Sequence, residues 1–333
     1  MTRSEPLRLT TAVRACLASI ATVACLHPGV VYGQSRPLTP DALLPNTLLV
    51  RAGAKQGFGF VVGVSNKQMI VATALHTVDH EGGDSPEVCF APNGERCVKG
   101  RLAYAADATG ALPALDLAFI TIPYPDALPW RTDVWARRTS AGASVRTIGR
   151  GSDWYVPARA GRVSAVDLAS SLLTYIGLDV TTGVSGAPVV SDAGIVAMHM
   201  QELGSPAGAR GITIEAIRQR LELYAPGSWA LVHPAECAAH AALRSEMEGR
   251  DVVVRFRAAA LQTAVTAAAQ LSCLGARARL APAWEASGFS GDEIVYRSGE
   301  LPTVRAIQAV LGAVGRLPGR LSPQSTVLEV RIP

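Results

Sequence analysis

Short apolar runs separated by turn residues fill the chain from Asn46 to about Val190. Each run is rich in Val, Ile, Leu, Thr or aromatic side chains, and Gly, Pro, Asn and Asp stand between the runs. Many short strands with turn signals between them are typical of an all-β sandwich or barrel, not of alternating βαβ units. The expected strands are Thr47–Arg51, Gly57–Val64, Met69–Ala74, Arg101–Tyr104, Leu117–Ile122, Ser144–Ile148, Gly161–Val166, Leu172–Leu178, Pro188–Val190 and Gly194–Met200.

The pattern changes beyond these strands. Ile214–Leu223 has apolar residues close to helical spacing, and this helix is expected to close a first domain that spans residues 46–226. A linking helix is expected at Pro234–Glu248. Residues 229–333 are predicted to form a small α+β domain with the β-α-β-β-α-β order of a ferredoxin-like unit. Its expected elements are the strand Asp251–Arg257, the helix Ala258–Leu274, the strands Ala278–Pro282 and Asp292–Arg297, the helix Pro302–Leu311 and the strand Thr326–Ile332.

The N-terminus has the pattern of an export signal. Arginines precede an apolar stretch, Ala15–Leu26, that is too short to span a bilayer comfortably. A cleavage site before Gln34 predicts a signal peptide at residues 1–33, followed by a polar arm at 34–45. Lipidation at Cys25 is an open alternative. The signal pattern predicts an exported protein, periplasmic or extracellular. No later apolar run has the length of a membrane-spanning helix, so we expect no transmembrane segment after the signal.

Charge and composition narrow the possible partners. The net charge of +4 is small for 333 residues, and 49% of the residues are hydrophobic, which is enough for buried cores. The basic residues are scattered and form no stripe that could neutralise successive phosphates, so nucleic acid is not an expected partner. No Cys-x-x-Cys spacing indicates a metal site. We expect neither a metal nor a cofactor.

Four cysteines remain after the predicted signal. Cys89 and Cys97 flank a segment with the Asn-Gly signature of a tight hairpin, and cysteines on the paired strands of a hairpin can approach closely enough for a disulfide. Cys237 and Cys273 then form a second pair. Four cysteines formally allow three pairings. Disulfides would agree with an oxidising compartment.

The segment Gly183-Val184-Ser185-Gly186-Ala187-Pro188 carries the most specific pattern in the chain. A serine hydroxyl is a weak nucleophile until a neighbouring base takes its proton. Gly183 allows the backbone to turn so that its N–H and that of Ser185 point to one spot, where they would hold the oxyanion of a tetrahedral intermediate. A structural Gly-Ser turn between two strands is the alternative interpretation.

A base and an acid precede this segment in the chain. His76 follows an apolar strand, and Asp116 stands among apolar residues, where a carboxylate is costly to bury without a partner such as an imidazole N–H. Asp79 and Asp107 are weaker candidates for the acid, because Asp79 is close to His76 in sequence and Asp107 lies in a polar loop. The order His76, Asp116, Ser185 is that of the chymotrypsin-type triad.

These three motifs resemble the trypsin-like peptidase family, in the bacterial branch of glutamyl endopeptidases and high-temperature-requirement proteins. The resemblance covers roughly residues 46–225 and implies a double β-barrel that hydrolyses peptide bonds through an acyl-enzyme. It implies that Ser185 attacks the scissile carbonyl, His76 transfers the proton and Asp116 orients the imidazole. Val184 departs from the family, which usually has a polar residue before the serine.

The resemblance gives a less definite picture of specificity. His199 lies where glutamyl endopeptidases have a pocket histidine, and Thr181 and Thr182 would complete such a pocket. Asp179 lies where trypsin has an acid that selects basic residues. The residues around it look more like the glutamyl type, which favours an acidic or small side chain before the cleaved bond. Ordinary strand residues are the alternative reading of Asp179 and His199.

Two other classes of protein are alternatives to an active trypsin-like peptidase. An α/β-hydrolase would need glycine where Ala187 stands and βαβ units around Ser185, and the sequence shows neither. A catalytically degenerate protease scaffold that acts as an envelope binding protein is the second rival. The predicted C-terminal domain has no ordered set of catalytic residue types, and we expect it to bind a protein or an envelope partner.

Overall fold

The computed structural model describes residues 40–332 with several gaps, so the predicted signal peptide and most of the N-terminal arm lie outside the described residues. Within the described part of the chain, no helix is both long enough and apolar enough to cross a membrane. The gaps are residues 66–67, 80–84, 92–93, 95, 106–113, 125–133, 135, 137, 179–182, 193, 205–207, 233–237, 258–259, 283–292, 313–316 and 324–327.

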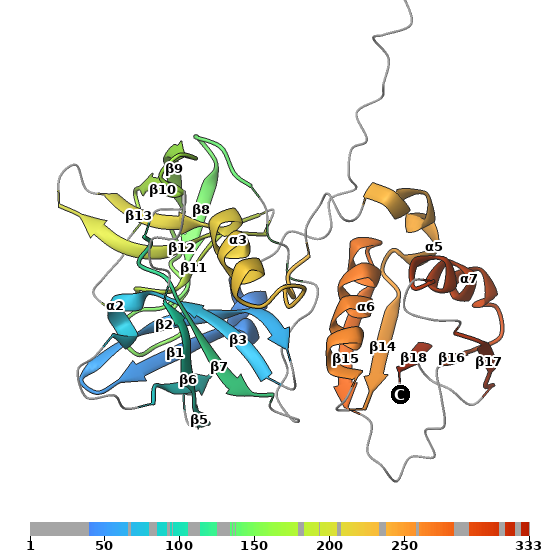
Figure 1. Cartoon of the computed structure of the whole chain (residues 1–333). Coiled ribbons are helices and arrows are strands. Elements are labelled where there is room, and N and C mark those ends of the chain that lie inside the picture. The colour runs from blue at the N-terminus through green and yellow to red at the C-terminus, as the bar shows by residue number, and fades with distance from the viewer. Residues whose placement is uncertain are drawn as a thin grey trace, which may run out of the picture. The chain divides into compact units, whose positions relative to one another are not determined.

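A seven-stranded antiparallel sheet follows a short 3₁₀ helix, η1 (Pro40–Asn46). Its strand order is β5-β4-β1-β2-β3-β7-β6, and a short helix, α2 (Leu75–Val78), follows β3 (Figure 1). The strands are β1 (Thr47–Ala52), β2 (Lys55–Ser65), β3 (Gln68–Thr73), β4 (Glu87–Phe90), β5 (Cys97–Lys99), β6 (Arg101–Ala105) and β7 (Ala118–Pro123).

A second set of six strands forms a closed barrel in the order β10-β13-β12-β11-β8-β9. The helix α3 (Ile214–Tyr224) follows the last strand, as the spacing of Ile214–Leu223 predicts. The strands are β8 (Ser144–Thr147), β9 (Gly161–Asp167), β10 (Leu172–Ile176), β11 (Pro188–Ser191), β12 (Gly194–Leu203) and β13 (Gly208–Thr213).

The predicted all-β architecture is confirmed with one correction. The second set of strands closes into a barrel, whereas the first is an open sheet, a half-barrel, in the described residues. β2, β3 and β7 are buried along nearly their whole length, because both faces of these central strands are covered. β9 alternates buried and exposed residues over its first half, as expected for a strand with one face in solvent.

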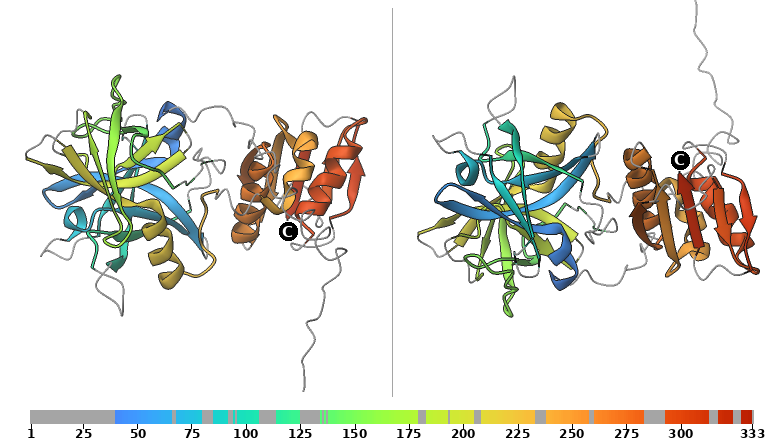
Figure 2. Two further views of the ribbon diagram at one scale, coloured as in Figure 1. Left: turned by 90° about the horizontal axis from the view of Figure 1, so that it is seen from above. Right: turned by 90° about the horizontal axis from the view of Figure 1, so that it is seen from below.

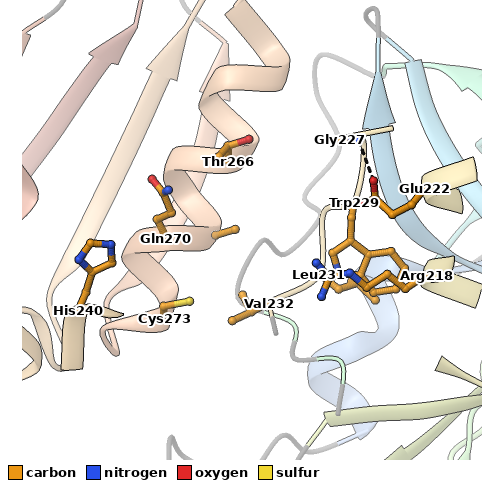
Figure 3. Close-up of a pocket in the computed structure, with 11 residues that line it drawn as sticks. Arg218, Glu222, Gly227, Trp229, Leu231, Val232, His240, Thr266, Gln270 and Cys273 are labelled. Atoms are coloured by element: carbon orange, nitrogen blue, oxygen red, sulfur yellow. Dashed lines mark hydrogen bonds between the residues drawn. The ribbon is translucent and has the colours of Figure 1, made fainter. Parts of the chain in front are cut away.

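The segment after α3 is fixed to the first sheet. Trp229 forms a β-bridge with Gly63 of β2, and the N–H of Ala230 donates to Val62 O at 2.9 Å. The guanidinium of Arg218 on α3 lies 5.6 Å from the centre of the Trp229 ring (Figure 3). The predicted domain boundary at 226–229 therefore falls inside a segment that is bonded to the strands before it. The domain limits themselves stay a prediction.

A separate five-stranded sheet lies near the C-terminus, with the order β15-β14-β18-β16-β17. The helices α6 and α7 cover one of its faces, since they contact β14, β15 and β16 and also each other (Figure 2). The predicted linking helix corresponds to two short helices, η2 (Ala238–Leu243) and α5 (Arg244–Met247). The other elements are β14 (Asp251–Phe256), α6 (Leu261–Cys273), β15 (Arg277–Pro282), β16 (Glu293–Tyr296), α7 (Leu301–Val310), β17 (Gly319–Leu321) and β18 (Leu328–Ile332).

The ferredoxin-like prediction for this region is not confirmed. In a split βαβ unit a third strand separates the two parallel strands, whereas β14 and β15 pair directly and in parallel. The short strand β17 is an additional element, and β18 lies between β14 and β16. The predicted order of strands and helices holds apart from β17. The periodicity of a strand indicates which side chains are buried, but not which strand is its neighbour.

Three of the four cysteines that are predicted to form disulfides lie among the described residues. Cys89 and Cys97 are directly opposite each other on β4 and β5 and form a disulfide, with their Cα atoms 4.0 Å apart, which confirms the hairpin prediction. Cys273, at the end of α6, is also disulfide-bonded. Its predicted partner, Cys237, lies outside the described residues.

Candidate active site

His76 and Asp116 are brought together by the pairing of β3 with β7. Thr73, the last residue of β3, is the register partner of Ala118, the first residue of β7. The segment after β3 therefore meets the segment before β7. The N–H of Leu75 donates to Asp116 O at 3.3 Å, which extends this pairing by one bond.

The carboxylate of Asp116 accepts two hydrogen bonds from His76. The ring Nδ1 lies 2.6 Å from Oδ2, and the backbone N–H donates to Oδ1 at 2.9 Å. The side chain of Asp116 is 26% exposed and that of His76 is 53% exposed. With Nδ1–H bonded to the carboxylate, the neutral imidazole has its free electron pair on Nε2, where a general base needs it.

The same contact changes the acidity of the ring. The hydrogen bond with Asp116 raises the pKa of His76 above its ordinary value of 6.5, and burial opposes this rise. The charge of Asp116 also raises this pKa, while the charge of Lys55 lowers it. His76 is therefore a stronger base than a free histidine.

Ser185 stands in the turn before β11, and three main-chain bonds tie this turn to neighbouring strands. Ser185 O accepts the N–H of Phe58 at 2.7 Å, which ties the turn to β2. The N–H of Gly186 donates to His199 O at 2.8 Å, and the N–H of His199 donates to Ala187 O at 2.8 Å. The nucleophile candidate is thus fixed between the first sheet and strand β12 of the barrel.

The turn with Ser185 packs closely against the segment that carries His76. A Cβ at Gly186 would lie 1.9 Å from Phe58 O and 3.0 Å from the N of Ala74, so only glycine fits here. A Cβ at Gly57 would lie 2.6 Å from Ser185 O and 2.9 Å from the Oγ1 of Thr77. The residue after His76 and the main chain of Ser185 therefore border the same glycine.

The hydroxyl of Ser185 does not bond to His76 in this structure. Its Oγ donates to Met200 O at 3.4 Å, a long contact. His76 and Asp116 are joined, and Ser185 lies on a turn packed beside them. Since catalytic hydrogen bonds of free enzymes often tighten only when substrate binds, this geometry is compatible with catalysis.

The turn also presents two backbone donors. Gly183 has a φ of +92°, which favours glycine, and it lies against Gly151. Within the described part of the chain, neither its N–H nor that of Ser185 donates a backbone hydrogen bond. These are the two groups that the sequence predicts as an oxyanion hole.

Of the four residues predicted to line the substrate pocket, the structure describes only His199. Asp179, Thr181 and Thr182 lie outside the described residues. His199 is 2% exposed, and its Nδ1 is hydrogen-bonded to the hydroxyl of Tyr175, which is fully buried on β10. Burial, and to a smaller degree the charge of His76, lowers the pKa of His199 to about 4. The ring is therefore neutral at neutral pH.

Two contributors to this site were missed from the sequence. Tyr175 lies in an ordinary strand pattern with no motif around it. Lys55 stands at the start of β2, and its Nζ donates to Asp79 O near the end of α2. The alternative acid Asp107 lies outside the described residues. Only the approach of separate segments in space gives Tyr175 and Lys55 their roles.

One group of possible metal ligands exists among the described residues, namely Glu87, Cys89 and Cys97. The two sulfur atoms are bonded to each other. A disulfide offers no thiolate, which is the form of cysteine that binds a metal. This group therefore does not fit a resident metal in the oxidised protein.

Residues 57–197 match the trypsin-like peptidase domain family, and this range contains His76, Asp116 and Ser185. The region that contains the closed barrel and the open sheet is thus similar to trypsin-like peptidase domains. The glutamyl-endopeptidase or high-temperature-requirement branch stays a prediction. Among curated proteins, none matches the sequence.

Solved structures with a similar chain include three bacterial proteases. The serine endoprotease of Yersinia pestis is 18% identical with a TM-score of 0.45, over 58% of this chain and 66% of that one. The Rv3671c protease of M. tuberculosis, in its inactive form, is 17% identical with a TM-score of 0.42, over 58% and 94%. The MamO protease domain of Magnetospirillum magneticum is 21% identical with a TM-score of 0.40, over 54% and 97%.

Proposed function

We propose that the chain is an exported serine endopeptidase that hydrolyses peptide bonds through His76, Asp116 and Ser185. One observation carries the proposal. The Asp116 carboxylate binds both the ring and the backbone of His76, and the tightly packed Gly186 brings the turn of Ser185 against the same segment.

The proposed reaction follows from these positions. The Ser185 hydroxyl rotates from Met200 O toward Nε2 of His76, which takes its proton as Oγ attacks the scissile carbonyl. The N–H groups of Gly183 and Ser185 stabilise the oxyanion. The His76 imidazolium, held by Asp116, returns the proton to the leaving amine. In the second half of the reaction, His76 takes a proton from water as the water attacks the acyl group, and it returns that proton to the departing oxygen of Ser185.

Export is part of the proposal. The apolar stretch after the N-terminal arginines supports it, as do the disulfide-bonded Cys89, Cys97 and Cys273, since structural disulfides persist in oxidising compartments. A periplasmic or extracellular location agrees with both observations. Fractionation of cells that express the full chain tests it, and mature protein in the cytoplasm with free thiols would contradict it.

A fluorophosphonate probe tests the catalytic centre. We expect covalent labelling of the folded protein that disappears in Ser185→Ala. Ser144→Ala, which removes an exposed hydroxyl on β8, is the matched control and should label like the wild type. Folded protein that does not label would favour the rival function, a binding protein on a protease scaffold.

For specificity we propose a small uncharged side chain before the cleaved bond. The resemblance to glutamyl endopeptidases implied an acidic or small one. His199 is buried, bonded to Tyr175 and neutral, so it offers no counter-charge to a carboxylate. Cleavage products from a peptide library test this, and a strong preference for Glu at neutral pH would contradict it.

The C-terminal sheet region is proposed to bind a protein or envelope partner. A deletion that tests this should begin at residue 238, because residues 228–232 are hydrogen-bonded to the strands of the first sheet and their neighbours. We expect the shortened protein to keep fluorophosphonate labelling and to lose retention on cell-envelope material. Unchanged retention would count against the proposal.

A further inference from the structure

Val184, directly before the nucleophile candidate, is buried in an apolar cluster. Its exposure is 1%, and its cluster contains Leu49, Phe58, Cys89 and Ala187. The polar residue that the trypsin-like family usually has at this position would need a hydrogen-bonding partner when buried. This chain instead anchors the turn by apolar packing on both sides of Ser185.

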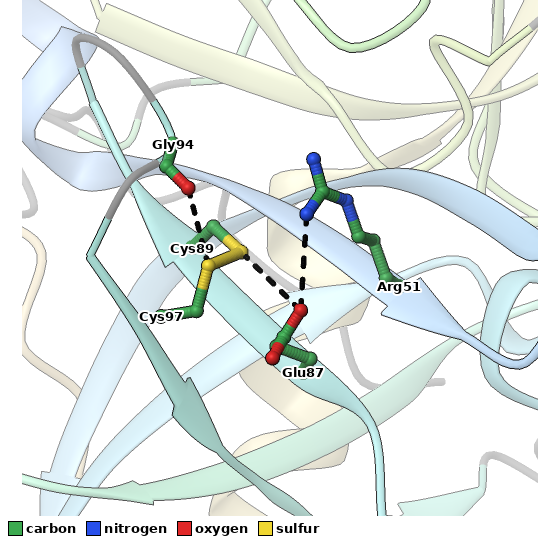
Figure 4. Close-up of a disulfide and its surroundings, with 5 residues drawn as sticks. All are labelled: Arg51, Glu87, Cys89, Gly94 and Cys97. Carbon is green, nitrogen blue, oxygen red and sulfur yellow. Dashed lines mark hydrogen bonds and ion pairs between the residues drawn. A yellow bond between two sulfur atoms is a disulfide. The ribbon is translucent and has the colours of Figure 1, made fainter.

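The cluster includes the Cys89–Cys97 disulfide. Cys89 is fully buried, and partly buried Cys97 packs against the same residues. Figure 4 shows the disulfide beside Gly94 of the hairpin turn, with Cys97 Sγ 3.2 Å from Gly94 O. Thus the crosslink of the β4–β5 hairpin forms part of the surface on which the turn with Ser185 rests.

Trp154 and Phe58 continue this contact. The indole N–H of Trp154 donates to Thr47 O at 2.8 Å, and its ring meets the Phe58 ring edge-on at 5.9 Å. A Cβ at Gly94 would lie 3.3 Å from the Trp154 ring. Phe58 in turn donates its N–H to Ser185 O. The hairpin turn, the two rings and the nucleophile turn are therefore in continuous contact.

We propose that Val184 and the Cys89–Cys97 disulfide are positioning residues for Ser185. The proposal rests on the proposed function, because it assigns them a role in that reaction. Packing fixes the turn more closely than main-chain bonds alone, since a cavity beside it lets the turn move. A displacement of the nucleophile by about 1 Å can lower the rate about a hundredfold.

The test compares Val184→Ala with Val163→Ala. Val163 is equally buried but belongs to a different cluster inside the barrel, so its truncation leaves a cavity away from Ser185. Below the melting temperature of every variant, we expect Val184→Ala to lower kcat and the rate of fluorophosphonate labelling about tenfold, with KM changed less than about twofold. Val163→Ala should lose stability and keep the wild-type kcat.

A double variant, Cys89→Ala with Cys97→Ala, tests the disulfide. It should lower kcat in the same way, and its effect should be non-additive with that of Val184→Ala, because both act through one cluster. If this variant does not fold, Trp154→Phe, which keeps a ring but removes the bond to Thr47, takes its place and should lower kcat with KM unchanged.

The outcomes separate this inference from the proposed function. Wild-type protein that does not label contradicts the proposed function itself. Wild-type protein that labels, together with a Val184→Ala variant that keeps kcat and loses only stability, overturns the positioning role. Strictly additive effects of Val184→Ala and the cysteine pair, or of Val184→Ala and Trp154→Phe, would also overturn it.

Discussion

The pKa of His76 is shifted by two charges of opposite sign, and this sets the expected pH dependence of the proposed reaction. Asp116 raises its pKa and Lys55 lowers it, with the hydrogen bond to Asp116 as the largest effect. In the proposed reaction, only the neutral ring can accept the proton of Ser185. The rate kcat/KM should therefore rise with pH through a midpoint above 6.5, the ordinary histidine value.

Kinetics between pH 5 and pH 9 check this expectation. Asp116→Asn should remove the bond that raises the pKa and lower kcat by roughly ten-thousand-fold. Lys55→Gln is the control with the opposite sign, because loss of its charge should move the midpoint slightly upward without a large loss of rate. A wild-type midpoint below 6.5 would contradict the assigned role of Asp116.

His199 gives a second pH dependence, this time of stability. Its pKa in the folded protein is about 4, below the value of 6.5 expected for the unfolded chain. Between these values the unfolded chain binds more protons, so the contribution of His199 is complete above pH 6.5 and is lost as the pH falls toward 4. The loss should be roughly 3 kcal/mol.

Urea unfolding at pH 7.5 and pH 4.5 measures this loss. His199→Gln cannot be protonated, and it should lose less stability between these two pH values than the wild type does. Tyr175→Phe should keep the pH dependence but unfold more easily at both values, because it leaves the buried Nδ1 without its partner. An equal pH dependence in His199→Gln and the wild type would contradict the prediction.

For single residues, the sequence indicates which side chains belong to a motif, but not what surrounds them in the fold. Ser185, His76 and Asp116 stand in recognisable motifs, so they can be nominated without coordinates. Tyr175 has no motif, and its importance arises only because β10 runs beside β13, which in turn pairs with β12. Pairing of strands far apart in sequence is the missing information.

The turn before β11 requires glycine at position 186. Gly186 has a φ of +85°, and a Cβ there would collide with Phe58 O at 1.9 Å. Gly186→Ala should destabilise the protein by at least about 3 kcal/mol and abolish labelling of Ser185, because the turn must move away from β2.

Gly142→Ala separates the collision from the backbone strain. Gly142 has a similar φ of +90°, but a Cβ there would meet nothing within 4 Å. Its substitution should cost only about 1–2 kcal/mol, the penalty of a left-handed conformation, and should leave labelling intact. Thermal unfolding and probe labelling of both variants decide the matter, and equal effects would contradict the close-packing explanation.

Patterns of burial predict most strands but not how they assemble. The structure has β2 and β7 where the sequence predicts the strands Gly57–Val64 and Leu117–Ile122. These strands could be predicted because a strand covered on both faces needs a long apolar run. β17 was missed because its three residues are all exposed. The open first sheet and the direct pairing of β14 with β15 could not be predicted, because strand neighbours depend on contacts between distant segments.

At the scale of the whole molecule, apolar and charged side chains are sorted onto different faces of a sheet. In the five-stranded sheet, the face toward α6 and α7 is apolar, and the opposite face carries a chain of ion pairs. Glu329 bonds Arg255 at 3.0 Å and Arg331 at 3.0 Å, Arg331 bonds Glu293 at 2.8 Å, and Glu293 bonds Arg320 at 2.7 Å. The alternation of apolar and charged residues along β18 produces this division.

Glu329 is the central charge of this series of ion pairs, because it is paired with two arginines that would otherwise repel each other. Arg255 and Arg331 are register partners on neighbouring strands, and like charges directly opposite each other are destabilising. The side chain of Glu329 is only 10% exposed, so solvent screens the contact weakly. Glu329→Gln should lower the free energy of unfolding by about 1–3 kcal/mol.

Asp251→Asn on the same β14 strand is the matched control. Asp251 pairs with Arg277 at 2.8 Å, but both side chains are more than 60% exposed, so this substitution should change stability by less than about 1 kcal/mol. Hydrogen exchange of the β14 and β18 amides reports the local effect. Since the ion pairs serve the sheet and not the reaction, Glu329→Gln should label at Ser185 as fast as the wild type. Slower labelling of the fully folded variant would show that this sheet influences the turn that carries Ser185.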